Sequence, residues 1–138
     1  MAIRFNFQKH IKITNRKALK EFLKGIFESE GIQLGELDYV FCDDPYILNV
    51  NQTFLKHNYF TDIITFDISD SPTEVVADIY ISAERVRENA LKLQVSLSAE
   101  VLRVIVHGAL HLVGFRDKTS SEKAKMRAAE DKYLKLIG

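Results

Sequence analysis

The chain has 138 residues, of which 46% are hydrophobic and 28% are charged, and its lysines and arginines balance its acidic residues. This length fits one domain, over residues 1–138, with a single hydrophobic core, and the zero net charge by itself favours no class of partner. Cys42 is the only cysteine, so an intrachain disulfide is excluded and no disulfide-linked partner is expected. The N-terminus lacks the apolar region of a signal peptide, and no apolar run is long enough to span a membrane. We therefore expect a cytoplasmic protein without a membrane partner.

Charge is unevenly distributed near the N-terminus. Residues 9–24 contain six lysines and arginines and one acid, Glu21, whereas residues 28–44 contain six acids and no lysine or arginine. The basic segment is typical of the solvated face of an amphipathic helix, but it is also typical of a phosphate-binding patch. The sequence leaves both interpretations open.

Hydrophobic periodicity predicts two strands and two helices in the first half of the chain. Apolar and polar residues alternate over residues 2–8, which indicates a half-buried strand. Helical spacing over residues 15–30 predicts an amphipathic helix that a glycine can end. Residues 36–42 are rich in aromatic and branched side chains and predict a second strand. An Asp-Pro pair then starts a short predicted helix over residues 45–55.

The second half of the chain predicts a hairpin followed by three helices. Residues 62–68 and 74–81 are two strand-like segments, and the turn residues between them indicate an antiparallel hairpin. Helices are expected over residues 82–93 and 99–113, and a capping box at residues 119–122 is expected to open the last helix. This order predicts an α+β fold with a mixed sheet of about four strands packed with about five helices.

The predicted helix over residues 99–113, which Ser98 can cap, is apolar around most of its circumference. Such a pattern is typical of a buried helix. Four polar residues interrupt it at spacings of three or four and therefore share one face: Glu100, Arg103, His107 and His111. Because buried polar groups without partners are costly, this face is expected to meet partners or a cavity.

The two histidines begin a possible metal-binding motif. His107 and His111 lie one helical turn apart, and Gly114 can end the helix so that Asp117 turns back as a third ligand. The string H-x-x-x-H-x-x-G-x-x-D has the ligand spacing of metzincins, with aspartate as the third ligand. It predicts a zincin-like metal-binding helix that holds one divalent ion, with zinc the favoured metal. Three protein ligands leave a position open for water or substrate.

Several alternatives to a catalytic metal site stay open. Zincin peptidases carry a glutamate after the first histidine, but this chain has Gly108, which disfavours a peptidase. Asp117 could instead cap the last helix, and Arg103 could bind phosphate or pair with a carboxylate. Two histidines and one carboxylate also occur in non-haem iron oxygenases. A metal site with a structural rather than a catalytic role is a further alternative.

The same motif resembles that of the YbeY family of bacterial metal-dependent endoribonucleases and rRNA maturation factors, and the resemblance covers most of the chain. The family signature H-G-x-L-H-L-x-G-[YF]-D-H is matched at His107, Gly108, Leu110, His111, Leu112, Gly114 and Phe115. The segments "LNVNQTF" and "TDIITFDI" resemble the family's Leu-Asn helix and T-[DN]-V-L-S-F strand. "ADIYIS" resembles its G-D-I-x-I-S strand, and Glu122 and Met126 fit its E-x-x-x-M pattern.

Two departures from the family pattern affect the expected site. The family usually ends its motif in Asp-His, where this chain has Arg116-Asp117, so that the third ligand position falls on Asp117. The family often carries an arginine where this chain has Leu55, and the neighbouring Lys56 and His57 can replace its charge as substrate contacts.

The resemblance implies hydrolysis of single-stranded RNA in rRNA maturation and ribosome assembly, with the small ribosomal subunit as a partner. It also suggests Asp62 as a catalytic or metal-supporting residue, whereas its position alone favours a turn residue at the start of a strand. Arg103, one turn before His107, is a candidate to bind phosphate or to stabilise charge during catalysis.

Overall fold

The computed structural model describes residues 2–54 and 62–137 and contains nine helices and strands within them. In chain order these are β1 (Ala2–Phe7), α1 (Arg16–Ser29), β2 (Leu34–Cys42), α2 (Asp44–Phe54), β3 (Ile63–Asp67), β4 (Val75–Ser82), α3 (Ala83–Leu93), α4 (Leu97–Leu112) and α5 (Ser120–Ile137). This arrangement confirms the predicted α+β fold, with a mixed four-stranded sheet and five helices.

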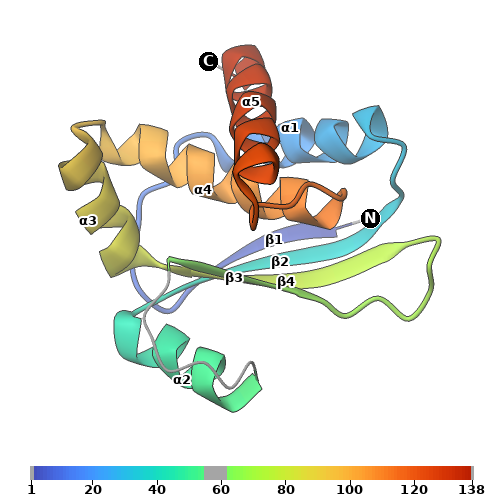
Figure 1. Cartoon of the computed structure of the whole chain (residues 1–138). Helices are drawn as coiled ribbons and strands as arrows, with labels where there is room; N and C mark the ends of the chain where they lie inside the picture. Colours follow the sequence, from blue (N-terminus) through green and yellow to red (C-terminus); the bar gives the residue numbers. More distant parts are fainter. Residues whose placement is uncertain (1, 55–61, 138) are drawn as a thin grey trace.

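The sheet has the strand order β1-β2-β4-β3. β1 pairs with β2 and β2 pairs with β4 in parallel, whereas β3 and β4 form the predicted antiparallel hairpin. Helices α1, α3, α4 and α5 lie on one side of the sheet, and α2 lies on the other (Figure 1). The two edge strands of the sheet are β1 and β3, and α4 contacts the β3 edge.

Side-chain caps fix where α1, α3 and α4 begin. The Asn15 side chain accepts a hydrogen bond from the Ala18 N–H at the start of α1, and Ser82 does the same for Arg85 in α3. For α4, Ser98 was the expected cap, and this prediction is wrong. Ser96 accepts from the Ala99 N–H at 3.1 Å, so α4 begins two residues earlier than expected.

Helix α4 packs closely on the sheet because Gly108 has no side chain. A Cβ atom at Gly108 would lie 2.9 Å from Ile79 Cδ1 in β4 and 3.1 Å from Ile63 Cδ1 in β3. The buried Tyr39 of β2 also ties the sheet to the helix, since its hydroxyl donates to the Ile105 carbonyl at 2.8 Å. These contacts fix the distance between α4 and the sheet, and with it the position of the polar face of α4 relative to β3.

In the described part of the chain, no single helix has both the length and the hydropathy that a membrane-spanning helix needs, and α3 and α4 meet that test only as a pair bent by 118°. The single cysteine, Cys42, is a free thiol buried at the end of β2, and burial raises its pKa to about 12.

Candidate metal centre

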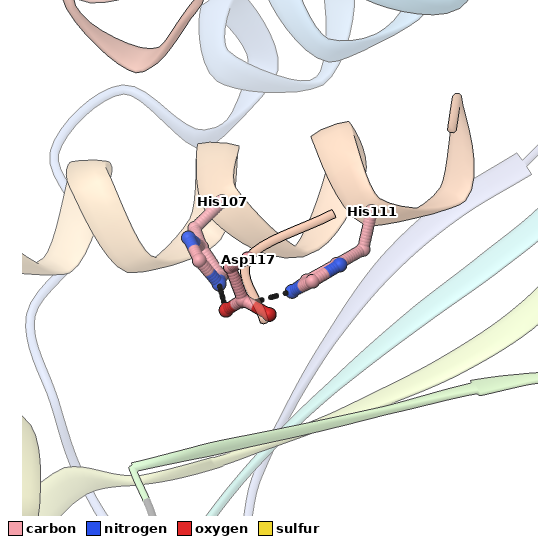
Figure 2. Close-up of side chains that lie close together, drawn as sticks. All are labelled: His107, His111 and Asp117. Carbon is pink, nitrogen blue, oxygen red and sulfur yellow. Dashed lines mark ion pairs between the residues drawn. The ribbon is translucent and has the colours of Figure 1, made fainter. Parts of the chain in front are cut away.

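The three predicted ligands converge on one point beside the C-terminal half of α4. The Nε2 atoms of His107 and His111 lie 3.3 Å and 3.4 Å from Asp117 Oδ2. Figure 2 shows the Asp117 carboxylate between the two imidazoles, and one ligand atom from each of the three residues lies within 4.8 Å of the others. This group could hold a metal ion, as a zincin-like helix was predicted to do.

The turn after α4 brings Asp117 back to the histidines. Gly114 adopts a φ of +110°, a backbone conformation that favours glycine, and the Phe115 N–H donates to the Leu110 carbonyl at 3.0 Å. The chain then reverses and places Asp117 beside the helix it has just left. The alternative role of Asp117 as a helix cap is not what the structure shows, because Thr119 and Glu122 form the predicted capping box of α5.

Both histidines are held so that Nε2 is available to a metal. The Nδ1 atom of His111 lies 3.1 Å from the Phe115 carbonyl oxygen, which can only accept, so Nδ1 carries the proton and Nε2 carries the lone pair. Likewise, His107 Nδ1–H donates to Glu130 Oε2 at 2.7 Å. Partners of this kind on the second ring nitrogen are characteristic of histidines that ligate metals. The residues present therefore fit a divalent ion.

Glu130 of α5 is a residue of this site that the sequence reasoning missed. Its side chain is 6% exposed, and besides the bond from His107 it accepts one from Arg103 Nη1 at 2.8 Å. Burial raises the pKa of its carboxyl, but the bonds from His107 and Arg103 outweigh this and the net shift is downward. Burial lowers the pKa of His107, and the bond to Glu130 reverses that shift to a net rise. Its position four residues after Met126, on the buried face of α5, was the available signal.

Arg103 makes the carboxylate pairing that was one of its two predicted roles. Its guanidinium binds Glu130 on one side and Asp131 Oδ1, at 2.9 Å, on the other. The side chain is 23% exposed and lies one turn before His107 on the polar face of α4. In this arrangement Arg103 braces Glu130, and its direct contact with a substrate phosphate stays a prediction.

The metal-binding group opens into a cleft of about 830 Å³ between α4, α5 and the edge strand β3. Asp62, just before β3, lines the cleft, where it accepts from Asn89 Nδ2 at 3.3 Å and where burial raises its pKa. Glu100, the first residue of the polar face, also lines it. Lys56 and His57, the predicted substrate contacts, lie outside the described residues, as does Leu55.

Gly108 faces the sheet rather than the cleft. Its missing side chain would meet Ile79 and Ile63, and neither of these is a metal ligand. A glutamate at this position, as in zincin peptidases, would separate α4 from the sheet instead of reaching a metal-bound substrate.

Comparison with known proteins agrees with this site. The family model described as endoribonuclease YbeY matches residues 3–138. The chain belongs to this family. An endoribonuclease YbeY of Flavobacterium psychrophilum is 42% identical over 98% of this chain and 96% of its own length. One of Porphyromonas gingivalis is 45% identical over 88% of this chain and 80% of its own. Family membership confirms the resemblance on which the expected endonuclease activity rested.

A solved structure has the same fold. The solution structure of a Thermotoga maritima protein aligns with a TM-score of 0.61 and 29% identity, and it covers 96% of this chain and 87% of that one. The placement of the metal-binding helix over the sheet therefore agrees with an experimentally determined arrangement.

Proposed function

We propose that this chain is a metal-dependent endoribonuclease of the cytoplasm that hydrolyses phosphodiester bonds in single-stranded RNA during rRNA maturation and ribosome assembly. It would hold one zinc ion at His107, His111 and Asp117 and act in contact with the small ribosomal subunit. Membership of the endoribonuclease YbeY family supports the RNA substrate. The observation that carries the proposal is the convergence of two imidazole Nε2 atoms and one carboxylate in an open cleft.

The chemistry divides between the metal and the surrounding side chains. A bound zinc ion would polarise a phosphoryl oxygen and lower the pKa of water toward about 7. The Phe115 carbonyl and Glu130 hold the two imidazoles with Nε2 directed at the ligand position. Because these partners already hold the two imidazole rings, the rings need to move little when a metal binds.

Proton transfer requires a base that is not a ligand. Asp62 is our candidate, because it lines the same cleft without belonging to the metal-binding group and Asn89 orients its carboxylate. It could accept a proton from water or from the 2′-hydroxyl of the RNA. Arg103 would act chiefly through Glu130, since both of its carboxylate partners are already in place.

Metal content measured by elemental mass spectrometry tests the proposal first. We expect about one zinc per chain in protein purified without chelators or a metal-affinity tag, and a clear loss in Asp117→Ala. Asp70→Ala is the matched control, because Asp70 is exposed in the β3–β4 turn and should leave the metal content unchanged. The same samples should cleave single-stranded RNA in proportion to their zinc.

One result would overturn the catalytic proposal. If wild-type protein is empty, and added zinc neither binds nor stabilises it, the histidine face of α4 is polar packing. The chain would then be better studied as a non-catalytic factor that binds the ribosome.

A further inference from the structure

The cleft beside the metal-binding group is acidic, which poses a problem for an anionic substrate. Of the described residues that line it, five are acids and three are lysine or arginine: Asp62, Asp67, Glu100, Asp117 and Glu130 against Arg103, Lys123 and Arg127. A divalent ion would offset part of this charge. An RNA backbone nevertheless needs cations along its path, because phosphate contacts dominate the affinity of proteins for nucleic acids.

Arg103 does not supply such a cation freely. Its two terminal nitrogens bind Glu130 at 2.8 Å and Asp131 at 2.9 Å. These pairs offset the charge of the guanidinium and engage both of its terminal nitrogens. Among the described residues that line the cleft, the positive charges still available to a ligand therefore lie on α5.

Lys123 and Arg127 are the available cations, and both are exposed on the cleft wall formed by α5. Lys123 forms no ion pair with any residue in the described ranges. Within the described residues, the ion pair of Arg127 is a long contact of 3.9 Å with Glu130 Oε1, and its side chain stays 61% exposed. The two residues are four positions apart, so they lie on one face of the helix about one turn from each other.

The segment from Asp117 to Glu130, which includes the start of α5, contacts the metal-binding group at both of its ends. Asp117, before the helix, contacts both histidines, and Glu130, further along it, contacts His107. Arg127 precedes Glu130 by about 4.5 Å of helix rise and Lys123 precedes it by about 10.5 Å. The two cations therefore stand between two anchors of the metal site rather than at a distant surface.

We infer that Lys123 and Arg127 form a phosphate-binding lip on α5 that holds the backbone of single-stranded RNA across the acidic cleft. This inference rests on the proposed function for its substrate, since it names the contact that the RNA makes beside the metal. It assigns to α5 two roles at once, which are to support His107 through Glu130 and to bind the nucleotides that flank the scissile bond.

The dependence of RNA binding on salt tests the lip directly. The probe is a fluorescein-labelled oligouridylate of twelve nucleotides with 2′-O-methyl sugars. Its dissociation constant would be measured by fluorescence anisotropy with zinc-loaded protein between 50 and 200 mM KCl. For Lys123→Gln/Arg127→Gln we expect about tenfold weaker binding at 50 mM KCl. The slope of log K against log salt should fall by about 1.4, because each lost phosphate contact on a single strand removes about 0.7.

Lys125→Gln/Lys135→Gln is the matched control. It removes the same charge from exposed positions of α5 that do not line the cleft, and it should leave the slope unchanged. Equal losses in both double variants would mean that only net charge matters and would overturn the lip, as would an unchanged slope in Lys123→Gln/Arg127→Gln. Equal zinc content and equal melting temperatures exclude misfolding as the cause.

Cleavage of unmodified oligouridylate on a denaturing gel separates this inference from the proposed function. If wild-type protein cleaves RNA but the lip variant binds with an unchanged slope, the lip is wrong and the nuclease stands. If wild-type protein loaded with zinc cleaves no RNA, yet the slope falls as expected, the nuclease proposal fails while the phosphate-binding lip stands.

Discussion

The two faces of α4 depend on different kinds of interaction. The face toward the sheet is apolar and close-packed, and a glycine at position 108 lets the helix approach Ile79 and Ile63. The other face is polar, and His107 and His111 on it meet Asp117 and Glu130 from beyond the helix. Packing of the first face requires complementary shapes, whereas the second face requires side chains from other segments at defined positions. The same helix can therefore lose its function without unfolding, or unfold without any change to its ligands.

Replacing His111 with Ala separates the two faces most sharply. The change removes one of three ligands, so we expect RNA cleavage to fall by more than about 100-fold, since loss of a supporting partner alone costs 10–100-fold. The fold should survive, because the His111 side chain is 28% exposed and lies outside the packed face. Cleavage assays beside circular dichroism would check this. Loss of folding together with cleavage would instead support a structural metal.

Replacing Glu130 with Gln tests whether α5 positions the metal ligands. Glutamine keeps the size of the side chain but removes the negative charge that His107 and Arg103 share. We expect zinc affinity, measured by competition with a chromophoric chelator, to fall about 10- to 100-fold. The nitrogen shifts of the His107 ring in NMR spectra should show loss of the single tautomer.

Asp131→Asn is the control for Glu130→Gln. It removes the other carboxylate partner of Arg103, which is exposed and has no contact with a histidine among the described interactions. Its zinc affinity should stay close to that of wild type. Matching losses in the two variants would assign the effect to Arg103 and would contradict a direct role for Glu130.

The polar face also shows where the sequence was informative. His107, His111 and Asp117 could be predicted because their spacing is local and each residue type ligates metals. Their metal occupancy stays a prediction, but the structure does bring them together. Glu130 could not be assigned in this way, because its contact with His107 spans 23 residues and depends on how α5 crosses α4. Its position four residues after Met126 places Glu130 on the inward face of α5, but that signal does not tell which residue it contacts.

The fold followed from the sequence with smaller errors. Periodicity, aromatic and branched composition, and capping residues together predicted each helix and strand that the structure describes, and the hairpin of β3 and β4 was confirmed. The start of α4 was misplaced because Ser96 and Ser98 are equally good caps in sequence. The structure begins the helix at Leu97, whose side chain packs against the core. Tertiary packing therefore decided between two locally equivalent caps.

Replacing Gly108 with Val tests the packed face of α4. The new side chain must displace Ile79 and Ile63, so we expect a loss of about 1–3 kcal/mol in the free energy of unfolding. Gly25→Ala is the control, because Gly25 lies inside α1 with nothing within 4 Å of a new Cβ. That change should stabilise the protein by about 0.5–1 kcal/mol. Urea titrations would measure both, and a neutral Gly108→Val would show that the sheet can move away from α4.

The smallest effect is expected for Lys17→Gln/Lys20→Gln in the basic segment of α1. This segment carries more positive charge than the lip on α5, but its surroundings differ. Lys20 lies 5.8 Å from the centre of the Phe5 ring, and Phe5 belongs to β1, the sheet edge opposite the cleft strand β3. Such cations are typical of a solvated helical face, so the salt dependence of oligouridylate binding should not change. A slope reduced by about 0.7 for each charge would instead extend the RNA path over α1. The charge of a segment would then matter more than its position relative to the polar face of α4.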